Sequence, residues 1–143
     1  MPNPDSARET PHGEVVYVLA HTHWDREWYL PAGRFRQRLV ALIDELLDGD
    51  EPRSPFLLDG QAVVLDDYLD VRPERANDLA AALQEGTIEA GPWYVLADEL
   101  IPSGEALVRN LLAGRRTVSG EDHRHHVSQR IAPRAAALHR GRV

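Results

Sequence analysis

The residues that decide the fold are Val15-Val16-Tyr17-Val18-Leu19-Ala20, followed directly by His21-Thr22-His23-Trp24-Asp25-Arg26-Glu27-Trp28-Tyr29. Six apolar residues in a row, β-branched at three positions, predict a strand near residues 14–20 that is buried on both faces, as in a parallel sheet covered by helices. The carboxyl end of such a strand is where α/β folds place their chemistry. The polar and aromatic residues after Ala20 are therefore the first candidates for a functional site.

A metal site is the first hypothesis for this segment. Side chains alternate along an extended chain, so His21, His23 and Asp25 are expected on one side, with the residues between them on the other. Imidazole and carboxylate together suit zinc and the other divalent first-row metals. The alternative is that the histidines are ordinary loop residues and that Asp25 caps a following turn. Three candidate ligands at alternate positions, with tryptophans beside them, favour the metal.

The pattern after this segment predicts strands alternating with helices. Phe35, Leu39 and Ile43 recur at helical spacing in an amphipathic helix that ends near Gly49. A short buried strand follows at residues 56–58, helical patterns follow at residues 61–70 and after Pro73, and a third strand is expected at residues 87–90. Strand, helix and strand in this order imply a right-handed parallel unit, which places the strand ends on one face.

Further helix signals and candidate site residues lie toward the second half of the chain. Gly86 marks the end of the helix after Pro73, and Ser103 and Gly114 are expected to begin and end another helix. Asp59 comes at the end of the second strand, where it is either a wall of the site or simple Asp-Gly turn chemistry. Trp93 and Tyr94 follow Gly-Pro after the third strand. They either pack in the core or form an aromatic wall for a sugar.

The run from His21 to Tyr29 resembles the first signature of glycoside hydrolase family 38, the zinc-dependent α-mannosidases, especially the bacterial branch. A second block, residues 91–99 followed by residues 103–112, is similar to the next conserved region of that family. The blocks stand in the family's order and spacing, and the resemblance covers roughly residues 15–116. It implies the opening part of a parallel (β/α)7-type barrel, with strands near 14–20, 56–58 and 87–90 and flanking helices.

The resemblance also implies site residues and a chemistry. His23 and Asp25 match two zinc ligands, Trp28 matches an aromatic residue beside the bound sugar, and His21 matches a motif position without an assured ligand role. The candidates for substrate binding are Trp28, Asp59, Trp93 and Asp98. The implied reaction is retaining, zinc-dependent hydrolysis of terminal α-linked mannose in oligosaccharides, and it needs two carboxyl groups flanking the glycosidic bond.

Composition excludes several classes of function. The net charge of -7 argues against a general nucleic-acid or anionic-membrane surface. There is no cysteine, hence no disulfide framework, and no lysine, since all 16 basic residues are arginine. The first residues lack the basic and apolar regions of a secretory leader, and no stretch reaches membrane-spanning length, so the cytoplasm is the expected location.

The two ends of the chain are expected to differ from its middle. Residues 1–13 are predicted to be a disordered arm, residues 14–116 to be the partial family domain, and residues 117–143 to be a basic tail that is unlike the family. From Glu121 onward the chain carries five arginines and four histidines against two acidic residues. The family's Leu-Pro-Asp-Ser-Phe-Gly-His type segment, whose Asp is nucleophile and zinc ligand, has no match here. We therefore expect a truncated or frameshifted domain with an incomplete zinc site and little activity.

Two alternatives remain at this point. An amidohydrolase-like metal hydrolase also opens on His-x-His after its first barrel strand, but its common bridging lysine cannot occur in a chain without lysine, and the Gly-Pro-Trp-Tyr block has no place in it. A non-enzymatic carbohydrate-binding fragment is the other alternative, and no residue positively supports it.

Overall fold

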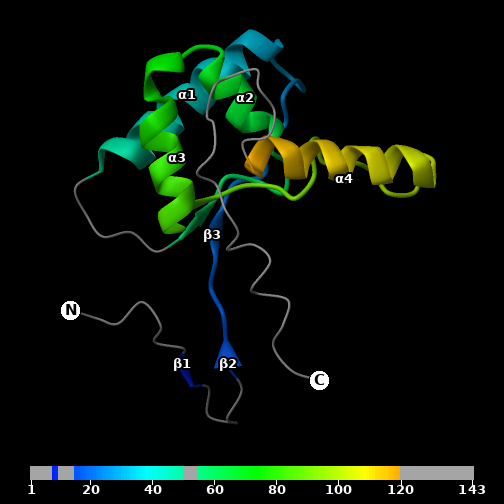
Figure 1. The fold of residues 1–143 in the computed structure, drawn as a ribbon, viewed down its shortest axis with the longest axis horizontal. Helices are drawn as coiled ribbons and strands as arrows, with labels where there is room; N and C mark the ends of the chain where they lie inside the picture. Colours follow the sequence, from blue (N-terminus) through cyan, green and yellow to red (C-terminus); the bar gives the residue numbers. More distant parts are fainter. Residues whose placement is uncertain (1–7, 10–14, 50–54, 120–143) are drawn as a thin grey trace.

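The computed structural model of this chain describes residues 8–9, 15–49 and 55–119, and within them the fold is mixed α/β (Figure 1). The strands are β1 (Arg8–Glu9), β2 (Val15–Val16), β3 (Ala20–His21), β4 (Phe56–Leu57) and β5 (Ile88–Glu89). The helices are α1 (Ala32–Asp48), α2 (Val63–Leu69), the 3-10 turn η1 (Pro73–Arg75), α3 (Ala76–Glu85) and α4 (Gly104–Ser119). None of the helices in the described ranges has the length and apolar character needed to cross a bilayer.

A small parallel sheet positions the candidate site. Its order is β3-β4-β5, with Ala20 opposite Phe56 and Phe56 opposite Ile88. Helix α1 connects β3 to β4, and α2, η1 and α3 connect β4 to β5, which is the strand, helix, strand order that the sequence predicts. The three strand ends therefore lie on one edge of the sheet, and the residues that follow them meet there.

The core lies between the sheet and the helices. Phe35, Leu39 and Ile43 are the buried residues of α1, as their spacing predicts. They meet α2, whose Tyr68 is fully buried and donates a hydrogen bond from its hydroxyl to Asp44 Oδ1 at 2.7 Å. The nine residues of the central apolar cluster come from α1, the residue after β4, α2, α3 and β5, and they are Leu39, Ile43, Leu58, Val64, Leu65, Tyr68, Leu69, Leu79 and Ile88.

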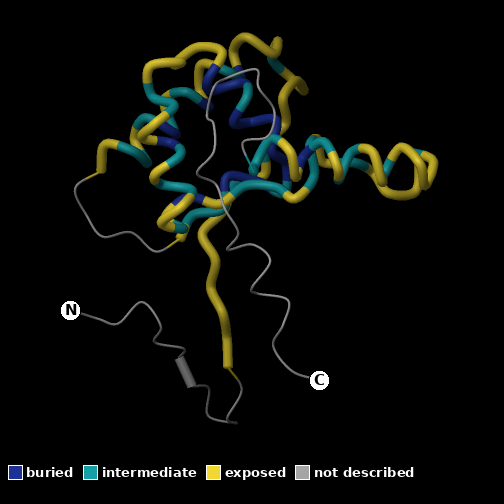
Figure 2. The backbone as a smooth tube through the Cα atoms, in the orientation of Figure 1, coloured by how far each residue is buried: buried dark blue, intermediate teal, exposed yellow. Residues whose placement is uncertain are grey.

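The expected first strand is wrong in its extent and its burial. Instead of one strand near residues 14–20, the structure has β2 and β3 separated by an extended segment that runs away from the helices (Figures 1 and 2). Tyr17 is 88% exposed and Val18 is 92% exposed. The reason is that β3 pairs only with β4 and β2 pairs only with β1, so nothing in the described part of the chain covers this segment. An apolar run is buried only where a partner exists.

The two ends of the chain can be compared with the expected domain limits only where the structure describes them. Within the arm expected at residues 1–13, Arg8–Glu9 form the antiparallel partner of β2. The rest of that arm falls outside the described residues. Of the tail expected from residue 117, the first three residues belong to the last turn of α4, and residues 120–143 fall outside the described residues.

Helix α4 corrects a second expectation. Ser103 begins it as predicted, because its hydroxyl accepts a hydrogen bond from the Ala106 N–H at 3.2 Å. Gly114, however, does not end the helix, which continues to Ser119. A Cβ at Gly114 would lie 2.3 Å from the carbonyl oxygen of Pro92 and 2.3 Å from the carbonyl carbon of Trp93. Glycine is required there because the helix backbone packs directly on the segment after β5.

We predict that Gly114→Ala destabilises the fold by at least about 1–3 kcal/mol, since the added methyl group must displace backbone rather than a flexible side chain. Gly104→Ala, in the first turn of the same helix, is the matched control because a Cβ there meets nothing within 4 Å. It should stay within about 1 kcal/mol of wild type. Urea unfolding followed by far-ultraviolet circular dichroism measures both, and equal midpoints would contradict the close approach.

Candidate functional site

The segment after β3 runs along the end of β4. The Thr22 N–H donates to the Leu57 carbonyl at 3.0 Å, and the Thr22 hydroxyl bonds to the Leu58 carbonyl. The side chains from His21 to Asp25 then alternate between exposed and half-buried, so the extended conformation continues past the strand. His23 and Asp25 lie on the exposed side, and Trp24 lies on the other.

The two candidate ligands meet on the exposed side. His23 Nε2 lies 3.7 Å from Asp25 Oδ1, and the two side chains are 66% and 47% exposed. Two donors that bind one zinc ion tetrahedrally, at about 2.1 Å each, stand about 3.4 Å apart. The pair therefore fits two corners of a zinc site, although its role as a ligand pair stays a prediction.

His21 does not complete a three-ligand cluster. It belongs to β3, and its Nδ1 lies 3.1 Å from the carbonyl oxygen of Thr22. In residues 8–9, 15–49 and 55–119, no group of three or more His, Asp or Glu side chains lies close enough to hold a metal ion. Alternation alone placed His21, His23 and Asp25 on one side, but only the last two converge.

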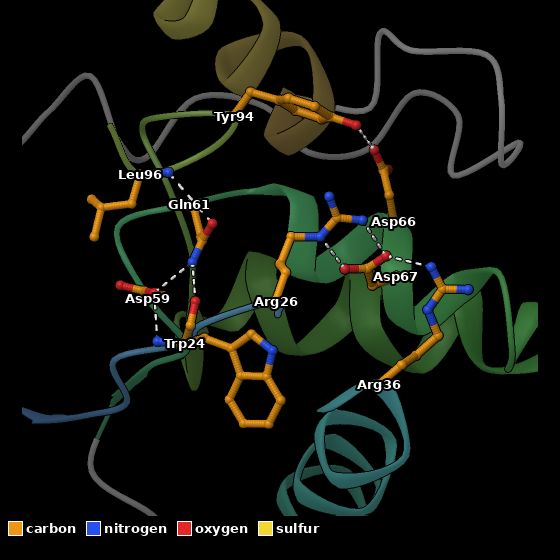
Figure 3. Close-up of polar contacts among 9 residues, drawn as sticks. All are labelled: Trp24, Arg26, Arg36, Asp59, Gln61, Asp66, Asp67, Tyr94 and Leu96. Atoms are coloured by element: carbon orange, nitrogen blue, oxygen red, sulfur yellow. Dashed lines mark hydrogen bonds and ion pairs between the residues drawn. The ribbon is translucent and has the colours of Figure 1, made fainter. Parts of the chain in front are cut away.

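The Trp24 side chain faces the interior and anchors the segment on the side opposite His23 and Asp25. Its ring packs edge-on against Phe35 of α1, with centroids 6.2 Å apart, and its backbone is held by two residues from the end of β4 (Figure 3). The Trp24 N–H donates to Asp59 Oδ2 at 2.8 Å. The Gln61 side-chain amide donates to the Trp24 carbonyl at 2.6 Å and to Asp59 Oδ2 at 2.8 Å.

Hydrogen-bond donors surround Asp59, which the sequence offered as a wall of the site or as turn chemistry. It is only 5% exposed, and its oxygens accept hydrogen bonds from Trp24, Gln61 and the Gly60 N–H. The last of these is the Asp-Gly turn contact that was the alternative interpretation. The Asp59 carboxylate therefore lies on the buried side of the segment, and both of its oxygens accept hydrogen bonds.

Arg26 provides a second anchor, which sequence reasoning did not identify. Its guanidinium donates to both oxygens of Asp67 in α2, at 2.7 and 2.8 Å, and Arg36 of α1 donates to the same carboxylate at 2.9 Å (Figure 3). The hydrogen bond to Asp67 raises the pKa of the Arg26 guanidinium, against the opposing effect of partial burial. The sequence signal for this contact is Asp67 itself, an acidic residue at helical spacing from the apolar residues Val63 and Val64. Its partners lie 31 and 41 residues away in the chain.

The aromatic candidates differ in their surroundings. Trp28 is 76% exposed, so its ring presents an open apolar face. Trp93 is half-buried and pairs in parallel with Gln61, which places the segment after β5 beside the end of β4. Tyr94 donates from its hydroxyl to Asp66 Oδ2 at 3.1 Å, so it is tied to α2.

Asp98 is exposed and makes a turn of its own. Its side chain accepts a hydrogen bond from the Leu100 N–H at 3.1 Å, and its carbonyl accepts one from the Ile101 N–H at 3.1 Å. Its role in substrate binding therefore stays a prediction, as do those of Trp28, Asp59 and Trp93.

We predict that Asp67→Asn destabilises the fold by about 1–2 kcal/mol, because two charge-assisted ion pairs to half-exposed arginines lose their anionic partner. Glu105→Gln is the control, since Glu105 pairs with Arg109 where both side chains are more than two-thirds exposed. It should change the free energy of unfolding by less than about 0.5 kcal/mol. Urea titration measures both, and an equal effect would contradict a structural role for the Arg26 anchor.

The comparisons with known proteins agree on one family. The model of the glycosyl hydrolases family 38 N-terminal domain matches residues 14–128. The match runs past residue 117, where the sequence pattern led us to expect a departure. A relative from Halalkalibacterium halodurans, named "Putative mannosylglycerate hydrolase", is 42% identical over 104 residues, which are 71% of this chain and 12% of that protein.

Two solved structures from Enterococcus faecalis are similar as well. One is an α-mannosidase from strain V583, with a TM-score of 0.68 and 44% identity over 71% of this chain. The other is a glycosyl hydrolase family 38 protein, with a TM-score of 0.64 and 40% identity over 73% of this chain. This chain covers 12% of each of them, as it does of the relative. On the match of its sequence, supported by the likeness of its fold, the chain belongs to glycosyl hydrolase family 38 and corresponds to part of that family's N-terminal domain.

Proposed function

We propose that this chain carries one strand end of an α-mannosidase-type glycosidase site, with His23 and Asp25 as two of the zinc ligands. The observation that carries the proposal is the 3.7 Å approach of His23 Nε2 to Asp25 Oδ1 on the exposed side of a segment whose other side is anchored. The family membership supplies the reaction class, and the names of the similar proteins point to mannose-containing substrates.

The residues of this chain would act by holding and orienting. When bound, zinc would supply a positive charge that orients sugar hydroxyl groups. His23 would offer its neutral ring nitrogen and Asp25 its carboxylate, while Trp28 would offer an exposed ring on which the apolar face of a sugar can stack. The role of Trp28 is supported by its exposure and its place three residues after Asp25.

The domain limits follow from the same proposal. We propose that the partial family domain covers at least residues 14–116, as the opening part of a parallel (β/α)7-type barrel, and the family match extends to residue 128. The parallel order β3-β4-β5 supports this, since these would be three consecutive barrel strands. A cytoplasmic location and a zinc cofactor also belong to the proposal.

We expect little or no turnover from the 143-residue chain on its own. Retaining hydrolysis needs a nucleophilic carboxylate about 5 Å from an acid, on opposite sides of the glycosidic bond. No residue of the sequence matches the family's nucleophile segment, and the described ranges bring only two candidate ligands together. The matched segment is only 12% of each of these relatives, and the rest of those proteins can supply what this segment does not.

Zinc binding tests the proposal directly. In a background where the tail histidines His123, His125, His126 and His139 are replaced by Gln, we expect weak zinc binding that His23→Ala or Asp25→Asn reduces by more than about tenfold, since losing a ligand costs more than losing an outer-shell partner. His21→Ala is the matched control and should leave the affinity unchanged. Competition with a chromophoric chelator gives the dissociation constants. Equal affinity in the wild type and the His23 variant would overturn the proposal.

Hydrolysis of an aryl α-mannoside tests the expected lack of turnover. The purified chain, supplied with zinc, should release aryl alcohol no faster than buffer containing the same zinc concentration. Activity that disappears in Asp25→Ala would contradict this expectation. It would mean that a carboxylate of this chain serves as the nucleophile, with Asp98 the first exposed one to replace.

A further inference from the structure

The two peptide groups that flank Trp24 are held by two buried side chains from the end of β4. We infer that Asp59 and Gln61, here called the Trp24 clamp, are positioning residues that fix His23 and Asp25 relative to each other. They act through the backbone of Trp24. This inference rests on the proposed function, because it assigns the clamp to the same zinc site.

The geometry follows from the planarity of the peptide bond. The Trp24 N–H belongs to the peptide group that begins at the Cα of His23, and the Trp24 carbonyl belongs to the group that ends at the Cα of Asp25. Asp59 holds the first group at 2.8 Å and Gln61 holds the second at 2.6 Å. Fixing both planes fixes the Cα positions of His23 and Asp25, from which the two ligand side chains extend, so the 3.7 Å approach of the ligands depends on the clamp.

The clamp is itself rigid. Asp59 is 5% exposed and Gln61 is 4% exposed, and the two are joined to each other at 2.8 Å. The Asp59 carbonyl accepts a hydrogen bond from the Gly91 N–H at 3.1 Å, which ties the clamp to the segment after β5. Buried side chains with their polar atoms satisfied have few alternative rotamers.

A backbone ladder alone would not give the same arrangement. At Thr22 the contact with the β4 strand is made by backbone, from the Thr22 N–H to the Leu57 carbonyl. Two residues later the Trp24 N–H donates to the Asp59 side chain, because the Asp59 backbone carbonyl already accepts a hydrogen bond from Gly91 after β5. The carboxylate therefore extends the pairing of the first segment beyond the point where the strands diverge. Asparagine could not replace it, since its side chain has one acceptor oxygen where Asp59 meets three donors.

Two isosteric variants test the clamp. Asp59→Asn places a donor against the donors of Trp24, Gly60 or Gln61, and Gln61→Glu places a second carboxylate where the amide donates. Both keep the volume of the side chain. Tyr68→Phe is the matched control, because it also removes a hydrogen bond of a buried side chain, but the hydroxyl that it removes bonds to Asp44 of α1 and not to the backbone of Trp24.

The first measurement is metal affinity in the background without tail histidines. With cobalt(II) as a spectroscopic probe, we expect the clamp variants to bind about 10- to 100-fold more weakly than wild type, as for other residues that orient ligands, and to show a changed visible spectrum. Tyr68→Phe should unfold at lower urea concentration but keep the wild-type affinity and spectrum. Unchanged affinity in a folded clamp variant, or an equal loss in Tyr68→Phe, would overturn the inference.

The second measurement needs no metal and separates this inference from the proposed function. Amide hydrogen exchange at Trp24 should be slow in the metal-free wild type, full chain, and in Tyr68→Phe. It should become fast in Asp59→Asn and Gln61→Glu. If cobalt does not bind to the wild type, the proposed zinc role fails, but slow exchange at Trp24 still supports the clamp. If Trp24 exchanges as fast as an unprotected amide in the wild type, the clamp is overturned whatever the metal result and however the variants fold.

Discussion

The carboxylate of Asp59 is the constraint on which the site depends. A buried carboxylate is costly unless donors surround it, and here three N–H groups from Trp24, Gly60 and Gln61 do so. The segment after β3 has the matching need. Where it leaves regular strand pairing, its Trp24 N–H requires another acceptor, and the Asp59 carboxylate provides it. The side chain of Asp59 is therefore well satisfied where it lies, and it holds the segment after β3 in an extended form in which His23 and Asp25 face outward.

The second block that resembles the family, which begins at residue 91, is held by a different kind of constraint. At Gly114 the backbone of α4 packs against the backbone of Pro92 and Trp93, and Asn110 of the same helix bonds through its side-chain amide to both the N–H and the carbonyl of Val95. The contact at Gly114 requires the absence of a side chain. The contact at Asn110 is made by a side-chain amide that pairs with Val95 as a backbone peptide group would. Together they keep the segment after β5 beside the end of β4, where the Gly91 N–H reaches Asp59.

Sequence patterns predicted the parts of the fold that are decided locally. The apolar stripe of α1, the left-handed Gly86 at the end of α3 and the Ser103 cap of α4 all depend on residues within a few positions of one another. The exposure of Tyr17 and Val18 could not be predicted, because an apolar run shows a tendency to be buried and not whether a partner is there to cover it. Gly114 was misassigned for a related reason, since a glycine at a helix end and one at a close backbone contact look alike in sequence.

The candidate site was likewise predicted only in part from the sequence. Alternation placed His23 and Asp25 on one side, and the structure brings them together. The roles of Asp59, Gln61 and Asp67 as anchors were missed, because each depends on a partner more than 30 residues distant, for which no short motif exists. The family resemblance pointed to the exposed residues of the segment and not to the buried ones that support it.

The long separation of these partners has a consequence for how the molecule folds. Trp24 and Asp59 are 35 residues apart, and Trp24 and Gln61 are 37 apart. Parallel pairing cannot begin with a tight turn, so each strand crossover must close a large loop before its two strands gain any hydrogen bond. The helices can form early from local contacts, whereas the segment that carries His23 and Asp25 is ordered only when the second strand arrives. We therefore expect the part of the candidate site that is synthesised first to be among the last parts to become structured.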